Sequence, residues 1–168
     1  MSLALAGRFP EAIRFANRYW EIDSTLANAA AVVSVLGEGG QVAEARRRAE
    51  VVLRLSPHAV NSAIAIAVIA EAGDPARAAT VFAQQRARFA GRDDGGNAWS
   101  MAWLALGDTA QALTAMEASD RRGLFGVIFN LGSRFYDPVR ASPRFAALVR
   151  KAGLDVALFS SPNGGRPR

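Results

Sequence analysis

The chain contains no cysteine and only one histidine, His58, among its 168 residues. Disulfides, thiolate metal sites and clusters of imidazole ligands are therefore excluded, and we expect neither a metal nor any other cofactor. His58 follows Pro57 between two helix-patterned segments, and no serine and acid can be assigned to it as catalytic partners from their spacing. The sequence favours a surface loop histidine over a catalytic base, and we expect no enzyme activity.

Lysine is almost absent, because Lys151 stands alone beside 19 arginines and 15 acidic residues, which leaves a net charge of +5. A basic chain can bind nucleic acid or an acidic membrane surface. The arginines are scattered, however, and the densest run, 46–48, is interleaved with Glu44 and Glu50. This mixture favours a solvated helix face over a binding patch. An arginine-rich nucleic-acid-binding module is kept as the alternative function.

Long apolar runs are also missing. The longest, Ala63–Ala70, has eight residues, whereas a membrane-spanning helix needs roughly 20. The N-terminal sequence MSLALAGRFPEA has no charged region ahead of its apolar residues and no cleavage site typical of a signal peptide. We therefore expect no membrane association and a cytoplasmic protein.

The sequence does contain a regular pattern of glycine and alanine. Four of its 15 glycines have an alanine five residues later, and these pairs follow one another at intervals of 33, 33 and 34 residues. Such regularity indicates an internal repeat. The pairs are Gly7 with Ala12, Gly40 with Ala45, Gly73 with Ala78, and Gly107 with Ala112.

Each repeated glycine lies between two helix-patterned segments of about a dozen residues. Those before it are 27–36, 61–72 and 98–106, and those after it are 41–55, 75–89 and 109–119. Asp74 followed by Pro75 is typical of a helix start, and Asp108 can cap the next helix in the same way. The glycine supplies the left-handed conformation that ends the preceding helix. The sequence thus predicts an all-α fold of helical hairpins.

The segment AVVSVLGEGGQVAEAR, 31–46, has a second interpretation as the strand, loop and helix of a phosphate-binding site. A dinucleotide fingerprint needs G-x-G-x-x-G, but Val42 stands where the third glycine should approach the strand. The corresponding turns at Gly73 and Gly107 have no glycine cluster. A helix–helix turn is therefore favoured here.

A helix–turn–helix unit of this length resembles the tetratricopeptide repeat. The resemblance rests on the Gly-Asp turns, the small residues Ala12, Ala45, Ala78 and Ala112, the position of Pro57, and the larger residues Phe82 and Met116. It implies an αα-hairpin superhelix of about three and a half repeats, near 1–24, 25–58, 59–92 and 93–120. The family's small residue in the first helix is replaced by Val33, Ile66 and Ser100, so a wider αα-solenoid relative stays open.

After Ser119 the repeat pattern stops, and residues 121–159 are expected to form C-terminal capping helices. We predict a helix near 122–131, one turn at 138–141 and a closing helix at 143–152, ahead of a disordered tail at 160–168. Three apolar residues share a face of the closing helix and should pack onto the last repeat, as the end of a solenoid requires. They are Phe145, Leu148 and Val149.

This ending resembles that of tetratricopeptide regions at the C-termini of bacterial signalling proteins, including class III adenylate cyclases and winged-helix regulators. The matching residues are Phe135, Asp137, Pro138, Arg140, Pro143, Arg144, Phe145, Leu148, Gly153 and Leu154. The resemblance implies a regulatory or partner-binding module and carries over no catalytic residue. Only six residues precede Gly7, which favours a fragment of a longer protein over a natural start with a short first helix.

The same resemblance places the first helix of each unit on a concave, partner-binding surface. Most residues there are small or apolar, which suits an apolar helix or chain segment of a protein partner, or another copy of the chain. Glu38 and Glu71 occupy equivalent positions and could receive a basic group of that partner. The expected groove residues are Ala30, Ser34, Glu38, Ala63, Ala67, Glu71, Asn97, Met101 and Leu104, with Ala27 and Val60 beside them.

Two further patterns could bind a ligand. Trp99 and Trp103 could stack on one, although tryptophans at helical spacing are more often part of a core. Asp93-Asp94-Gly95-Gly96 lacks the alternating ligands and the closing glutamate of a calcium loop, and is best explained as a long connection. The sequence favours a noncatalytic protein–protein interaction module.

Overall fold

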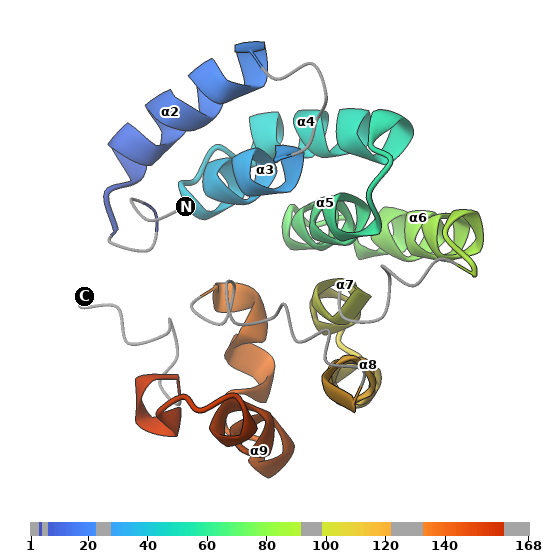
Figure 1. Ribbon diagram of the computed structural model, residues 1–168. Helices are drawn as coiled ribbons and strands as arrows, with labels where there is room; N and C mark the ends of the chain where they lie inside the picture. Colours follow the sequence, from blue (N-terminus) through green and yellow to red (C-terminus); the bar gives the residue numbers. More distant parts are fainter. Residues whose placement is uncertain (1–3, 5–6, 23–27, 92–98, 122–132, 160–168) are drawn as a thin grey trace.

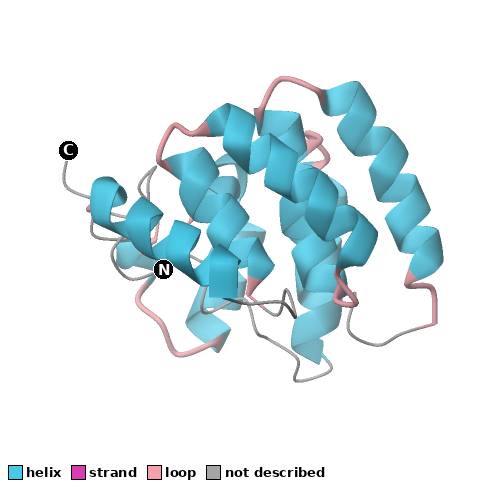
Figure 2. Ribbon diagram, turned by 90° about the horizontal axis from the view of Figure 1, so that it is seen from above, coloured by secondary structure: helices cyan, strands magenta, loops and turns pink. Residues whose placement is uncertain are grey.

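The computed structural model describes residue 4 and residues 7–22, 28–91, 99–121 and 133–159. Every element in these ranges is helical, and Figure 2 shows no strand among them. The prediction of an all-α fold is confirmed. The elements are α2 (Phe9–Ile22), α3 (Ala29–Glu38), α4 (Val42–Leu55), α5 (Ala59–Glu71), α6 (Pro75–Arg88), α7 (Trp99–Ala105), α8 (Thr109–Arg121), η3 (Arg134–Val139), α9 (Pro143–Lys151) and η4 (Val156–Leu158).

The turns between paired helices recur at the predicted glycines. Gly7, Gly40, Gly73 and Gly107 all have positive φ, between 76° and 89°. The amide of each donates to the carbonyl three residues earlier, at N···O distances of 2.9 to 3.1 Å. At Gly40, Gly73 and Gly107 the amide of the following residue donates to the carbonyl five residues before it, as Asp108 does to Trp103 at 2.9 Å. These bonds satisfy carbonyls that the end of a helix leaves unpaired.

The predicted helix starts are also present. The Asp74 side chain accepts a hydrogen bond from the Arg77 amide at 3.1 Å, with Pro75 at the first helical position. Asp108 accepts from the Gln111 amide at 2.9 Å. The strand that a phosphate loop would need is absent, because 32–36 lies inside α3.

The first helices of successive hairpins form an inner layer. Helix α3 packs against α4 and α5, and α5 packs against α6 and α7. Figure 1 shows the hairpins following one another around an arc that opens to the left, with α2 at one end and α9 at the other. The centre of this layer is α5, where Ala63, Ile66 and Ile69 have no exposed surface.

Buried polar contacts join the second and third hairpins. Gln85 of α6 donates to the carbonyl of Leu53 at 3.2 Å and accepts from the Ser62 hydroxyl at the same distance. Arg88 donates to the carbonyls of Leu53 and Ser56, both at 3.1 Å. These bonds supply partners for the last carbonyls of α4, which lie inside the protein. No pattern in the sequence predicts this network.

The C-terminal segment partly follows the prediction. Helix α9 ends just before Gly153, whose φ is +75°. Phe145, Leu148 and Val149 are buried, and α9 packs on α8. The turn expected at 138–141 is wrong in its bounds, because η3 spans Arg134–Val139, with Ser133 as its N-cap, and contains Pro138. The helix predicted near 122–131 and the tail at 160–168 lie outside the described residues.

Candidate interaction surfaces

The described residues hold no group of three His, Cys, Asp or Glu side chains that could bind a metal ion. Within the same ranges, none of the helices combines the length and apolar character needed to cross a membrane. His58 is exposed at the start of α5, as expected for a loop histidine. Trp99 and Trp103 belong to an aromatic cluster with Phe82, whose ring centroid lies 5.6 Å and 4.6 Å from theirs. The prediction that these tryptophans are core residues is confirmed for Trp99, which is buried, whereas Trp103 is partly buried and packs against the core.

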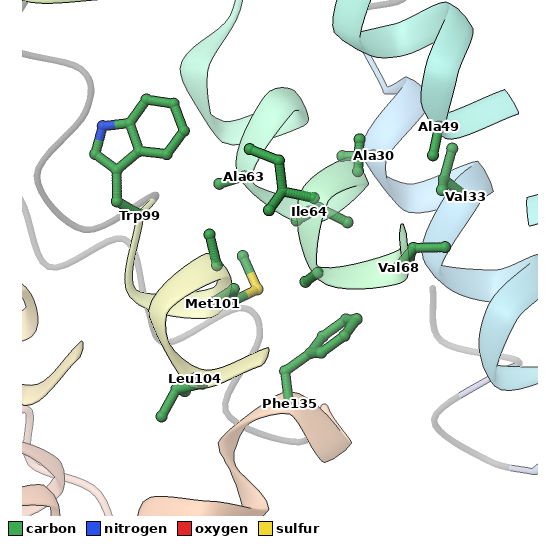
Figure 3. Close-up of a cluster of buried hydrophobic side chains, with 14 of the residues drawn as sticks. Ala30, Val33, Ala49, Ala63, Ile64, Val68, Trp99, Met101, Leu104 and Phe135 are labelled. Atoms are coloured by element: carbon green, nitrogen blue, oxygen red, sulfur yellow. The ribbon is translucent and has the colours of Figure 1, made fainter. Parts of the chain in front are cut away.

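The residues expected to line a concave groove are mostly buried within the chain itself. Six of them expose between 0 and 7% of their surface, and Figure 3 shows Phe135 of η3 directed into the cluster that contains several of them. The six are Ala30, Ser34, Ala63, Ala67, Met101 and Leu104. Val60 is 41% exposed. Asn97 and Ala27 lie outside the described residues.

The two carboxylates of this surface contact the segment that follows residue 132. Arg134 donates to Glu71 at 2.5 Å, and the Ser133 hydroxyl donates to Glu38 at 3.4 Å. Ser34 also donates to Glu38, at 3.2 Å. These contacts join residues 63 and 95 positions apart in the sequence. The basic group that reaches Glu71 therefore belongs to the same chain.

The electrostatics around Glu71 reflect this partly buried position. Burial raises the pKa of the Glu71 carboxyl above its ordinary value, and the attraction and hydrogen bond of Arg134 oppose that rise. The carboxylates of Glu38 and Asp137 raise the pKa further by repulsion. A cation at this position thus stabilises a carboxylate that its surroundings disfavour.

Segment 133–140 is held by more than the Arg134 contact. Arg140, only 3% exposed, donates to the carbonyls of Ser133 at 2.7 Å and Phe159 at 3.1 Å, and to the Asp137 carboxylate at 2.6 Å. Tyr136 is buried, shares a hydrogen bond with Ser100 of α7, and stacks on Phe145. Burial raises the pKa of Tyr136 to about 12.

A second surface is a groove of about 380 Å³ between α2 and α3, which we call the end groove. Four residues of α2 line it at helical spacing, and three residues of α3 line it together with the N-cap residue Asn28. Phe15 and Tyr19 of α2 are 65% and 40% exposed there, and Asn28 donates to the Tyr19 hydroxyl at 2.7 Å across it. The residues are Ala12, Phe15, Ala16, Tyr19, Asn28, Ala31, Val32 and Val35. This groove was not predicted, although Phe15 and Tyr19 share one helical face of α2.

Acidic side chains pair with many of the arginines. In the 46–48 run, Arg46 contacts Asp74 at 2.5 Å and Arg47 contacts Glu44 at 2.6 Å, and both arginines are solvent-exposed, as expected. Arg48 differs, since it is only 8% exposed and its guanidinium lies 5.0 Å from the centre of the Trp20 ring. The prediction of a solvated face is therefore wrong for Arg48, because α2 covers it.

No protein-family model matches the chain, and comparisons with curated proteins and with solved structures give no match either.

Proposed function

We propose that this chain is a noncatalytic protein–protein interaction module built as a tetratricopeptide-like superhelix. The turn that recurs at Gly7, Gly40, Gly73 and Gly107 supports this reading. So does the burial of Ala45, Ala78 and Ala112, the small residues placed where paired helices cross, at 0% exposure. Stacked hairpins of this kind produce an extended surface suited to binding a chain segment.

The observation that carries the proposal is the contact of Arg134 with Glu71. The inner surface already holds a short segment of polypeptide, which presents a basic residue to Glu71 and an aromatic residue, Phe135, to the apolar cluster. The module is thus a receptor for segments with this pairing of chemistry, and segment 133–140 is its resident ligand. A protein partner binds the same surface by displacing that segment.

The biological setting we propose is the regulatory C-terminal part of a cytoplasmic bacterial signalling protein. Several of the residues that resemble the C-terminal ending of tetratricopeptide regions in such proteins hold the C-terminal segment together. Arg140 joins the two ends of the C-terminal segment, Pro143 starts α9, and Gly153 ends it.

The test uses a double variant, Arg134→Ala/Phe135→Ala, that weakens the resident segment, together with a labelled peptide of sequence SRFYDPVR, 133–140. In the wild-type chain the tethered segment competes at an effective concentration of roughly millimolar. We therefore expect the peptide to bind the double variant at least tenfold more tightly than the wild type, by fluorescence anisotropy. Adding Glu71→Gln to the double variant should weaken this binding.

Circular dichroism must show that the double variant keeps its helices, and Arg144→Ala is the control. Arg144 of α9 also pairs with a carboxylate, that of Glu117 on α8, but it lies outside segment 133–140. A folded double variant with no gain in peptide affinity contradicts the proposal. Binding of duplex DNA that falls steeply between 50 and 200 mM salt would favour the nucleic-acid alternative instead.

A further inference from the structure

The spacing of the turn glycines continues beyond the last of them. The four glycines are 33 or 34 residues apart, and Arg140 comes 33 residues after Gly107. The Arg140 amide donates to the Asp137 carbonyl three residues earlier, at 3.4 Å, as the amide of each turn glycine does to the carbonyl three residues before it. Helix α9 then begins at Pro143, as α6 begins at Pro75. Arg140 therefore occupies the turn position that holds glycine in the preceding helix pairs.

The turn at Arg140 is stabilised by a different set of contacts. The glycine turns have positive φ, and their hydrogen bonds join residues three to five positions apart. Arg140 has a φ of −56°, and its side chain closes the turn. Its Nη2 donates to the Ser133 carbonyl at 2.7 Å, its Nε to the Asp137 carboxylate at 2.6 Å, and its Nη1 to the Phe159 carbonyl at 3.1 Å. This turn thus depends on an acceptor that lies 19 positions further along the chain.

The Arg140 guanidinium is buried, so the loss of one of its hydrogen bonds affects the others. The side chain is 2% exposed, and a buried cation is unfavourable unless its donors are paired. If Phe159 withdraws, Nη1 loses its carbonyl, and either water enters or the guanidinium moves toward solvent. Both changes weaken the bonds to Ser133 and Asp137, which lie in segment 133–140. The position of Phe159 is therefore coupled to the position of this segment.

Residues 154–159 are held less firmly than the segment to which Arg140 joins them. Val156 and Phe159 are only partly buried against the core. Phe135 and Tyr136, by contrast, are 5% and 1% exposed. Because local opening costs less free energy where less apolar surface is buried, residues 154–159 are the part that can detach first.

We propose that residues 154–159 are a clasp that keeps segment 133–140 on the inner surface, and that withdrawal of the clasp opens the surface around Glu71 to a protein partner. This inference rests on the proposed function and adds its regulation. Arg140 is the positioning residue that connects clasp and segment, because its guanidinium contacts both. A partner meets less competition from the resident segment once the clasp is displaced.

The test compares two shortened chains, one that stops after Asp155 and a matched control that stops after Asn163. The first lacks Phe159, and the second retains it. The amides of Tyr136 and Ser142 donate to carbonyls of segment 133–140, so their hydrogen exchange, followed by NMR, reports on the order of the segment. Relative to the full chain, we expect exchange at least tenfold faster in the first chain and unchanged within twofold in the control. The amides of α5 should keep their protection in both.

Phe159→Ala in the full chain is a milder variant, which decides the matter if circular dichroism shows that the first shortened chain has lost its helices. It removes the side chain that packs on the core and should raise the same exchange rates at least threefold. Unchanged exchange in a folded variant overturns the clasp and leaves the proposed function standing, because the Arg134→Ala/Phe135→Ala variant tests that function separately. Equal acceleration of the α5 amides indicates general destabilisation and also overturns the clasp.

Binding of the labelled 133–140 peptide is the second measurement. The peptide should bind the chain that stops after Asp155 at least tenfold more tightly than the control, by fluorescence anisotropy, because the tethered competitor is loosened. Faster exchange without this gain, when the double variant does bind the peptide, overturns the regulatory role of the clasp. If the peptide binds neither the shortened chain nor the double variant, the proposed function is wrong and the clasp has no binding surface to control.

Discussion

The glycines at the end of α3 provide a sharp test of the turn geometry, because two of them should respond oppositely to alanine. Gly40 has a φ of +84°, and a Cβ atom there would meet nothing within 4 Å. The cost of Gly40→Ala is therefore the cost of the left-handed backbone alone, about 1–2 kcal/mol. Gly37 lies within α3, and its added Cβ would contact Val68 and Ala45 at 3.8 to 3.9 Å, an ordinary packing distance. Gly37→Ala should stabilise the protein by about 0.5–1 kcal/mol.

The two variants should therefore bracket the wild type in urea unfolding followed by circular dichroism. Their difference of about 1.5–3 kcal/mol corresponds to several degrees in Tm for a chain of this size. Gly40→Asn should recover part of the loss, because asparagine tolerates the left-handed region better than alanine does. The reasoning is refuted if Gly40→Ala unfolds at the wild-type urea concentration, or if Gly37→Ala is the less stable of the two.

Three further predictions concern the C-terminal segment and the ionisable groups. Arg140→Ala should destabilise by about 3–5 kcal/mol, because it removes a buried cation together with its hydrogen bonds to the carbonyls of Ser133 and Phe159 and to the Asp137 carboxylate. Arg144→Ala, whose side chain is 44% exposed, should cost less than about 1 kcal/mol. Equal urea midpoints for the two variants would contradict this. Hydrogen bonding to Arg47, aided by Arg48, lowers the pKa of Glu44 from 4.5 to about 2. The ionised Glu44 carboxylate therefore contributes fully to the stability of the fold above pH 4.5, and this contribution is lost as the pH falls toward 2. Glu44→Gln should therefore lose less stability than the wild type between pH 5 and pH 2 in acid titrations monitored by circular dichroism. Burial raises the pKa of Tyr136 from 10.0 to about 12, so the unfolded chain ionises first and stability falls between those pH values; Tyr136→Phe should flatten this loss in unfolding measurements at alkaline pH.

Local chemistry explains why the hairpins could be predicted. A glycine with positive φ and a capping aspartate act within a few residues, so the turns at Gly73 and Gly107 are encoded in short stretches. The helices on either side agree with the predicted segments within a few residues.

Contacts between distant residues could not be predicted in this way. The pairing of Glu71 with Arg134 spans 63 positions, and no periodic pattern connects them. Arg48 belongs to an arginine run that suggested a solvated face, but Trp20 covers it. The end groove depends on how α2 packs against α3, whereas the sequence pattern shows only that Phe15 and Tyr19 share a face of α2.

Under the proposed function, the energetics of segment 133–140 limit which partners can replace it. The side chains of Arg134 and Glu71 are 40% and 30% exposed, so their pairing contributes no more than about 1 kcal/mol and weakens with salt. Phe135 and Tyr136 are 5% and 1% exposed, and burial of each aromatic side chain contributes about 1.5–3 kcal/mol. The charge pair therefore sets the orientation of the segment, and the aromatic residues hold it. A partner that displaces it must bury comparable aromatic or aliphatic area, and a basic residue alone is insufficient.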